Sequence, residues 1–150
     1  MNQRAAAAMG EDEVTAFLAD GRKVQLATIN PDGTPHLVTM FYGLSDGRIA
    51  FWTYRSSRKA HNLARDPRVT CLVEDGEDYF ALRGVQVAGE VQQIDDLAGV
   101  TEVGRLIAAR LPDVPTEALE AYVTHAAPKR TAYLVQPLRV ASWDHRKLLS

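Results

Sequence analysis

The hydrophobic pattern in the first half of the chain predicts one helix followed by three strands. In residues 11–20 the apolar side chains Val14, Phe17 and Leu18 recur at helical spacing. Beyond Gly21 apolar and polar positions alternate, which is the period of a half-buried strand. Two turn sequences rich in Pro, Asp, Ser and Gly divide this stretch into strands at residues 24–28, 36–42 and 49–54. Connections this short join antiparallel neighbours, so the pattern favours an antiparallel meander.

A short helix with a marked start and end is predicted at residues 56–66. Ser56 or Ser57 can accept a hydrogen bond from the first turn, and Pro67 cannot continue the helix. Alanine and leucine at positions 60, 63 and 64 form an apolar stripe that would face the protein core. A strand at residues 69–73 follows.

The second half of the chain predicts further strands and two helices. Residues 79–94 are β-like but too long for one flat strand, and Gly84 and Gly89 mark places for a bulge or a sharp bend. Helical patterns cover residues 97–107 and extend from residue 116 past residue 123. The last β-like segments are residues 132–135 and 140–143.

Six or seven antiparallel strands with a few short helices predict a mainly β, α+β fold, and a barrel hides the edges of such a sheet. The 150 residues suit one domain, residues 1–150, in which residues 1–10 are expected to form a flexible N-terminus. The net charge of −2 argues against nucleic-acid and membrane partners, and no apolar run reaches membrane-helix length. A single cysteine, Cys71, indicates a reducing compartment, so we expect a cytoplasmic protein.

Residues 55–68 contain five cationic side chains and only one acidic side chain, Asp66. Arg58 and Lys59 fall in the first turn of the predicted helix, where free backbone N–H groups and serine hydroxyls suit a phosphate or another anion. A solvated basic helix face explains the same charges. The position favours the anion site, because the aromatic strand at residues 51–54 places an apolar wall beside the cations, as a nucleotide-like cofactor requires.

Five pieces of sequence carry a resemblance to a known family. They are Ser57-Arg58-Lys59-Ala60-His61-Asn62-Leu63 and residues 26–36, 66–69, 82–90 and 140–145. Together they resemble the pyridoxamine 5′-phosphate oxidase family of flavin-binding split barrels, and most closely its short branch that binds FMN or the deazaflavin coenzyme F420. The resemblance spans residues 11–147. It implies an antiparallel split β-barrel of the FMN-binding type and a homodimer with two cofactor sites at the interface.

The resemblance also implies which residues hold the cofactor. The positions that match Arg58 and Lys59 grip its phosphate, and Asn62 is placed near it. Trp52 and Thr53, on the strand before the helix, supply further contacts. The remaining implied contacts are the backbones of Thr39, Met40 and Phe41 along the ring and the side chain of Trp143.

Two departures from the longer, pyridoxal-forming members argue against vitamin B6 oxidation. Gly84 stands where those members have a glutamine that contacts the flavin. The sequence Trp143-Asp144-His145-Arg146 does not reproduce their C-terminal arginine–histidine arrangement. We therefore expect a flavin- or deazaflavin-dependent oxidoreductase that transfers hydride between bound FMN or F420 and a small organic substrate.

The sequence marks no catalytic residue, and hydride transfer needs no protein nucleophile because the cofactor carries the reaction. The four histidines lack the spacing of zinc ligands, so no metal site is expected. The alternative is a non-catalytic flavin- or haem-binding sensor or carrier protein, with His61 as a haem ligand. A packing or surface role explains His61 as well, and Tyr42, Tyr54 and Tyr79 suit either a pocket or the core.

Overall fold

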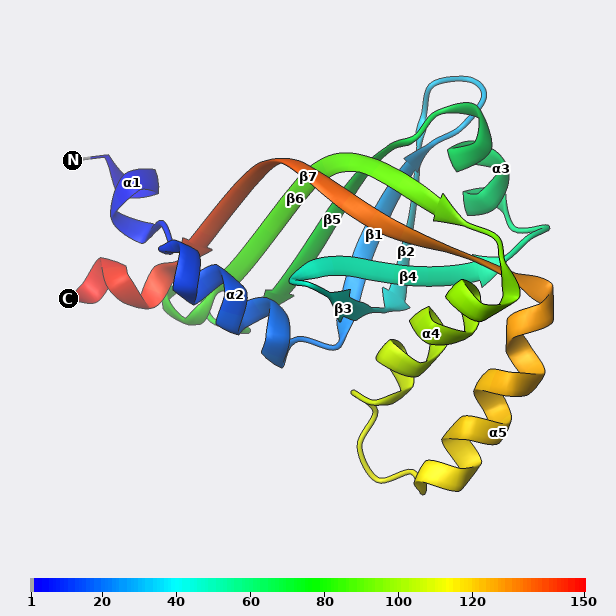
Figure 1. The fold of residues 1–150 in the computed structure, drawn as a ribbon. Coiled ribbons are helices and arrows are strands. Elements are labelled where there is room, and N and C mark those ends of the chain that lie inside the picture. Colours follow the sequence, from blue (N-terminus) through cyan, green and yellow to red (C-terminus); the bar gives the residue numbers. More distant parts are fainter. Residues whose placement is uncertain (1) are drawn as a thin grey trace.

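In residues 2–150, which a computed structural model describes, seven strands form one antiparallel sheet. The sheet order is β2-β1-β5-β6-β7-β4-β3. The strands are β1 (Lys23–Ile29), β2 (Pro35–Phe41), β3 (Gly43–Ser45), β4 (Arg48–Tyr54), β5 (Arg68–Asp75), β6 (Arg83–Ile94) and β7 (Arg130–Asp144). Figure 1 shows that the sheet curls into a half-barrel, which confirms the predicted split barrel of α+β class.

Alternating side chains on the inner face of the sheet form the main core. Val24 and Leu26 of β1 are fully buried, and Cys71 of β5 lies beside them in the same cluster. On the neighbouring strands β4 and β7 Phe51 stacks on Tyr133, its partner in the pairing register, with ring centroids 5.0 Å apart. The period of two that predicts these strands is thus the period with which they fill the core.

The two longest strands differ from the prediction in their extent. Residues 79–94 begin with a single 3-10 turn, η1 (Tyr79–Ala81), before β6 starts. The segments predicted at residues 132–135 and 140–143 belong to one strand, β7, which pairs with β6 along nearly its whole length. The residues between them, 136–139, and the first two residues of the second segment are all exposed, so the alternation disappears although the backbone pairing continues.

Gly89 lies at the bulge that the sequence predicts. The pairing register of β6 and β7 shifts between Ala88 and Gly89, and a Cβ atom on Gly89 would fall on the carbonyl oxygen of Gln136. Because a paired backbone cannot move aside freely, we expect Gly89→Ala to lower the free energy of unfolding by about 1–3 kcal/mol. Urea unfolding followed by circular dichroism measures this, and an unchanged midpoint would contradict the close approach.

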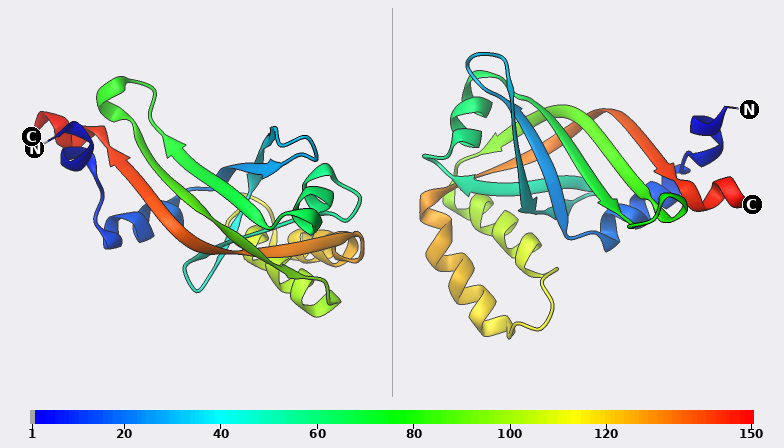
Figure 2. Two further views of the ribbon diagram at one scale, coloured as in Figure 1. Left: turned by 90° about the horizontal axis from the view of Figure 1, so that it is seen from above. Right: turned by 180° about the vertical axis from the view of Figure 1, so that it is seen from behind.

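Helices close both ends of the half-barrel and cover part of its outer face. α2 (Glu11–Asp20) buries Phe17 and Leu18 in the main core at one end. α3 (Arg58–Arg65) packs on β1 and β4 at the opposite end, as Figure 1 shows. α4 (Leu97–Ala108) lies against β4, and α5 (Thr116–Ala126) lies against α4, outside the sheet (Figure 2).

The segment predicted as a flexible N-terminus contains a short helix, α1 (Gln3–Ala7). Asn2 caps it, accepting a hydrogen bond from the Ala5 N–H at 2.8 Å. The helix lies beside the C-terminal turn η3 (His145–Leu149), and both chain ends meet at one tip of the molecule (Figure 1). Met1 lies outside the described residues. No helix within residues 2–150 has the length and apolar character needed to cross a membrane.

Candidate functional site

Ser57 fixes the first turn of α3 and caps the helix, as the sequence predicts. Its Oγ accepts hydrogen bonds from the Ala60 N–H and from the Thr53 hydroxyl, each at 3.1 Å. Thr53 is buried at the end of β4, so its hydroxyl joins the strand to the helix. Arg58 and Lys59 follow the cap directly and are held at this junction.

Arg58 and Lys59 differ from the other cations of residues 55–68 in the groups to which they bond. Arg68 forms a salt bridge with Asp66 at 2.8 Å, and its guanidinium holds the pKa of that carboxyl at about 2. The arginines at positions 55 and 65 donate to backbone carbonyls. Within residues 2–150 neither Arg58 nor Lys59 forms a salt bridge. Two cations are therefore available to an anionic ligand at one helix end.

Lys59 is half-buried, and its removal from water lowers the pKa of the ammonium from the ordinary lysine value of 10.5. A bound anion favours the charged ammonium of Lys59. Above the lowered pKa the free protein holds neutral Lys59, so anion binding is coupled to the uptake of a proton. We therefore expect the affinity for sulfate, whose own charge stays constant, to fall as pH rises through that lowered value. Calorimetric titration from neutral pH upward measures this, and a decline that persists in Lys59→Met would contradict the assignment.

Arg58 opens onto a shallow pocket of about 400 Å³ at the turn between β1 and β2. Asn30, Pro31, Asp32 and His36 form its other walls. Nδ1 of His36 is buried and has no hydrogen-bond partner within the described part of the chain. The sequence does not mark this histidine, because only the pairing of β2 with β1 brings it close to α3. It is a polar group that a bound ligand could satisfy.

Asn62, which the resemblance places near the phosphate, is fully buried and bonded within the protein. Its Nδ2 donates to Thr28 Oγ1 and to Asn30 Oδ1, each at 3.1 Å. Its Oδ1 lies 3.4 Å from the guanidinium of Arg65. Asn62 therefore fastens α3 to β1 and to the turn that follows β1. Its effect on the binding of a ligand would be indirect, through the position of the first turn of α3.

Three of the candidate cofactor residues meet at a second, apolar pocket. Met40, Phe41 and Trp52 line a cavity of about 240 Å³, and α4 and α5 supply its other walls. Trp52 faces this cavity because strand alternation turns it away from the side that carries Thr53. Thr39 is exposed on the edge strand β2 and lines neither this cavity nor the pocket at Arg58.

Trp143 lies at the opposite end of the molecule from α3. It lines a cleft of about 970 Å³ between the end of β7 and α1, and Figure 1 shows that this end of β7 and helix α3 lie on opposite sides of the molecule. Gly84 is its partner in the register of β6 and β7, and a Cβ atom on that glycine would collide with the indole ring. The glycine thus makes room for the tryptophan. Within one chain Trp143 does not meet Arg58 or Lys59.

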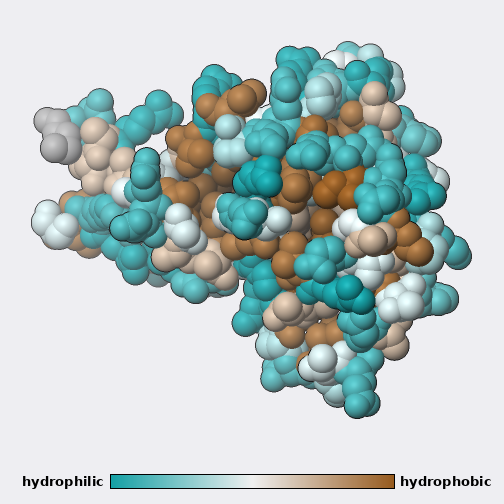
Figure 3. Space-filling model, viewed as in Figure 1, coloured by the Kyte–Doolittle hydropathy of each residue, from teal (hydrophilic) through white to brown (hydrophobic). Residues whose placement is uncertain are grey.

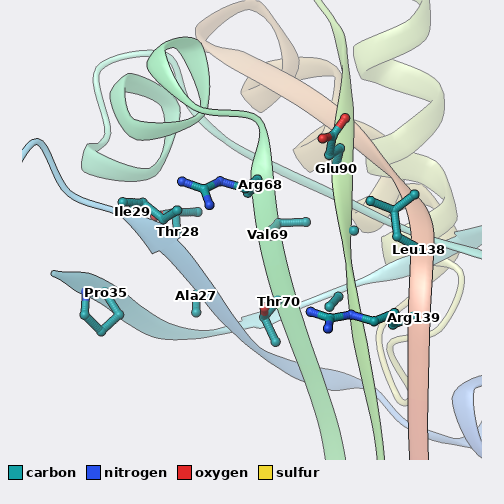
Figure 4. A pocket seen from close by; sticks show the side chains of 12 residues that line it. Ala27, Thr28, Ile29, Pro35, Arg68, Val69, Thr70, Glu90, Leu138 and Arg139 are labelled. Atoms are coloured by element: carbon teal, nitrogen blue, oxygen red, sulfur yellow. The ribbon is translucent and has the colours of Figure 1, made fainter. Parts of the chain in front are cut away.

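A further pocket, of about 380 Å³, lies on the sheet across β1, β5, β6 and β7 (Figure 4). Arg68, Arg139 and Glu90 are its charged residues, and small side chains of the strands form much of its lining. Leu138 stands at its rim with 69% of its surface exposed. None of the residues that the sequence singles out as cofactor contacts lies here.

The remaining candidates have structural explanations. Cys71 is a free thiol in the core, and burial raises its pKa to about 12. Tyr42 is also buried, its hydroxyl donates to the Leu18 carbonyl at 2.6 Å, and burial raises its pKa to about 12. In the described residues no three His, Cys, Asp or Glu side chains come close enough together to hold a metal ion.

Comparison with known proteins identifies the family. Residues 11–144 match the model of the pyridoxamine 5′-phosphate oxidase family, and the chain belongs to that family. A pyridoxine/pyridoxamine 5′-phosphate oxidase from Cupriavidus taiwanensis is 33% identical over 88 residues, which are 57% of this chain and 40% of that protein. The enzyme of the same description from Alteromonas mediterranea is 29% identical over 85 residues, 56% of this chain and 39% of the relative. The chain thus spans about 40% of the length of these relatives.

Solved structures share the whole fold. A conserved hypothetical protein from Mycobacterium tuberculosis has a TM-score of 0.91 and 39% identity, covering 100% of this chain and 94% of that one. A protein described as an F420 reductase has a TM-score of 0.61 and 22% identity, covering 84% and 94%. A haem storage protein from Vibrio cholerae has a TM-score of 0.69 and 16% identity, covering 88% and 94%. At such identities the last two establish likeness of fold alone.

Proposed function

We propose that this protein binds FMN or coenzyme F420 and acts as an oxidoreductase on a small organic substrate. The observation that carries the proposal is the pair Arg58 and Lys59, which have no salt-bridge partner in residues 2–150 and follow a strand whose Trp52 lines an apolar cavity. A phosphate suits the cations and a planar ring suits the aromatic wall. The proposal includes a cytoplasmic location, which the free, buried thiol of Cys71 supports.

The residues present fit such a cofactor. Arg58, the half-buried Lys59 and the unpartnered Nδ1 of His36 supply donors for a charged tail. Phe41 and Trp52 supply an apolar wall that keeps water from a ring. When bound, the cofactor supplies a hydride donor or acceptor at its ring. The side chains bind and orient it.

We also propose that the protein is a homodimer whose partner subunit completes each cofactor site. Trp143 supports this, because the resemblance implies that it contacts a cofactor, yet it lies in the cleft beside α1 and not in the pocket at Arg58 of its own chain. Leu37 of β2 and Leu138 of β7 are 65% and 69% exposed, and Figure 3 shows apolar side chains gathered over the middle of the molecule. Sedimentation equilibrium tests the proposal, and a monomer at micromolar concentration would overturn it.

Thermal melting with FMN and with F420 tests cofactor binding directly. A ligand that binds only the folded state stabilises it by about 2.7 kcal/mol at a hundredfold excess over its dissociation constant. We expect one of the two to raise the melting midpoint, and the proposal fails if neither does. Reoxidation of the reduced cofactor by quinones or enones, faster with the protein than without it, then separates an enzyme from a carrier.

A non-catalytic flavin- or haem-binding protein is the second candidate. His61 favours the haem version, because its side chain is exposed on α3 and free to reach an iron atom. The haem storage protein named above has the same fold. A sharp Soret band on titration with haemin, lost in His61→Ala, would support this candidate. Haemin spectra that are identical for the two proteins would exclude His61 as the ligand.

A further inference from the structure

We infer that the apolar cavity between α2 and the turn that joins β3 to β4 binds a small apolar carboxylic acid, and that Arg48 holds its carboxylate. Among the described residues that line this cavity there is no candidate cofactor residue. The inference therefore goes beyond the proposed function and does not depend on it. The class of ligand is a short aryl- or alkyl-carboxylate.

The cavity has the volume and the lining of a small-ligand site. It measures about 370 Å³, within the usual range of about 300–1,000 Å³, and such sites occur in the mouths of β-barrels. Its walls include Val14 and Leu18 of α2, Ile49 of β4, Val87 of β6 and Val135 of β7. Apart from Val14 these side chains belong to the main core, so an apolar ligand would be buried against the interior of the half-barrel.

Arg48 is the only charged residue among the described residues that line the cavity. It is half-buried, yet it forms no salt bridge with an acidic group of residues 2–150. A guanidinium that is partly removed from water loses hydration, and a carboxylate can offset that loss with two parallel charge-assisted hydrogen bonds. An apolar cavity with one unpaired cation therefore matches a ligand with an apolar body and one anionic end.

The turn before Arg48 fixes the position of its backbone. Asp46 and Gly47 have positive φ values of 50° and 79°, and Ser45 pairs with Arg48, which defines a two-residue hairpin. Gly47 also lines the cavity, so the turn itself forms part of the wall. Because the hairpin already orders this backbone, a carboxylate that binds Arg48 has only side-chain freedom to restrict.

The cavity is separate from the anion site at α3. α2 lies at one end of the half-barrel, and α3 with Arg58 and Lys59 lies at the opposite end (Figure 1). A carboxylate at Arg48 would leave these two cations free. We therefore expect saturating FMN to leave the dissociation constant of the acid within about twofold of its value without FMN.

Calorimetric titration with 4-phenylbutyrate tests the inference, and 4-phenylbutyramide is the neutral control ligand of similar shape. We expect saturable binding of the acid with a dissociation constant below about 1 mM, and binding of the amide at least about tenfold weaker. Arg48→Met keeps an apolar stem and removes the guanidinium, so it should weaken binding of the acid about tenfold. Equal affinity of the parent and Arg48→Met for the acid would overturn the inference, and so would an amide that binds as tightly as the acid.

Arg22→Met is the matched control variant. Arg22 lies in the connection between α2 and β1, is exposed, and does not line the cavity. The substitution removes the same charge at the same end of the molecule, and we expect the acid to bind within about twofold of the parent protein. Equal losses in Arg22→Met and Arg48→Met would show a general attraction of anions and would overturn the inference.

Ala19→Glu keeps the test valid if Arg48→Met fails to fold. Ala19 is exposed on α2 and lines the cavity, and glutamate is a good helix former. The new carboxylate adds a negative charge to the lining, so binding of the acid should weaken at least several-fold. Unchanged affinity would contradict the site.

Two other results would also overturn the inference by giving a different occupant. If Lys59→Met loses the acid and Arg48→Met keeps it, the acid binds at α3, and FMN should then displace it. If the parent protein binds no acid and Arg48→Met changes the association state in sedimentation equilibrium, the cavity is covered by a second copy of the chain.

Discussion

Replacing Lys59 by methionine is expected to lower the affinity for FMN about 10- to 100-fold while leaving the free protein at least as stable. A charge-assisted hydrogen bond contributes about 1.5–3 kcal/mol, which corresponds to that loss of affinity. The pKa of Lys59 is lowered by burial, so at neutral pH the folded state carries the cost of a partly desolvated ammonium. Methionine keeps the apolar stem and removes that cost. Thermal melting and fluorescence titration with FMN measure both effects.

Arg105→Ala provides the matched control for Lys59→Met. It removes one positive charge from α4, where Arg105 pairs with Glu120 at 2.7 Å and both side chains are half exposed. The net charge of the two variants is the same, but we expect Arg105→Ala to bind FMN within about twofold of the parent protein. Equal losses of FMN affinity in the two variants would show that the overall charge of the protein, and not Lys59 in particular, governs binding. A Lys59→Met protein that is less stable than the parent would show that Lys59 supports the fold.

The parts of the fold that the sequence predicted are those with local signals. Ser57 caps α3 because a serine side chain reaches a backbone N–H three residues away. Gly89 marks the bulge because its own position cannot hold a Cβ atom. The continuity of β7 has no such signal, since residues 136–141 are exposed and their pairing with β6 depends on residues some fifty positions away. Alternation measures burial, and it does not report backbone pairing.

The candidate site follows the same rule: residues with a local signal could be predicted from the sequence, and residues brought together by tertiary packing could not. Arg58 and Lys59 stand out in the sequence because cations in a first helical turn oppose the helix dipole and need a reason. His36 and Tyr122 do not stand out, because sheet pairing in one case and packing of α5 in the other bring them to their pockets. In the proposed homodimer Trp143 would contact the cofactor of the second copy, so a single subunit does not test its predicted role.

Asn62→Ala is expected to lower the free energy of unfolding by about 3–4 kcal/mol. The amide, in a position with no solvent exposure, makes hydrogen bonds to the buried Thr28 and to the half-buried Asn30, and a bond lost there leaves its partner unpaired at about 1–3 kcal/mol. Because α3 is then held less firmly, FMN affinity should also fall although Asn62 faces no ligand. Urea unfolding measures the first effect. A stability change below about 1 kcal/mol would contradict the bonding role.

Asn62→Asp distinguishes lost hydrogen bonds from lost packing. The carboxylate has the shape of the amide but no N–H, and it would face the oxygens of Thr28 and Asn30 from a fully buried position. We expect burial and the acceptor oxygen of Asn30 to raise the pKa of this carboxyl more than the Arg65 guanidinium, 3.4 Å from Oδ1, lowers it. Stability is then greatest below the unfolded pKa and is lost as pH rises through the raised one. We therefore expect Asn62→Asp to regain part of its stability on acidification, when the carboxyl can donate a hydrogen bond, while Asn62→Ala does not. If the two variants lose stability equally at every pH, α3 is held by side-chain volume alone.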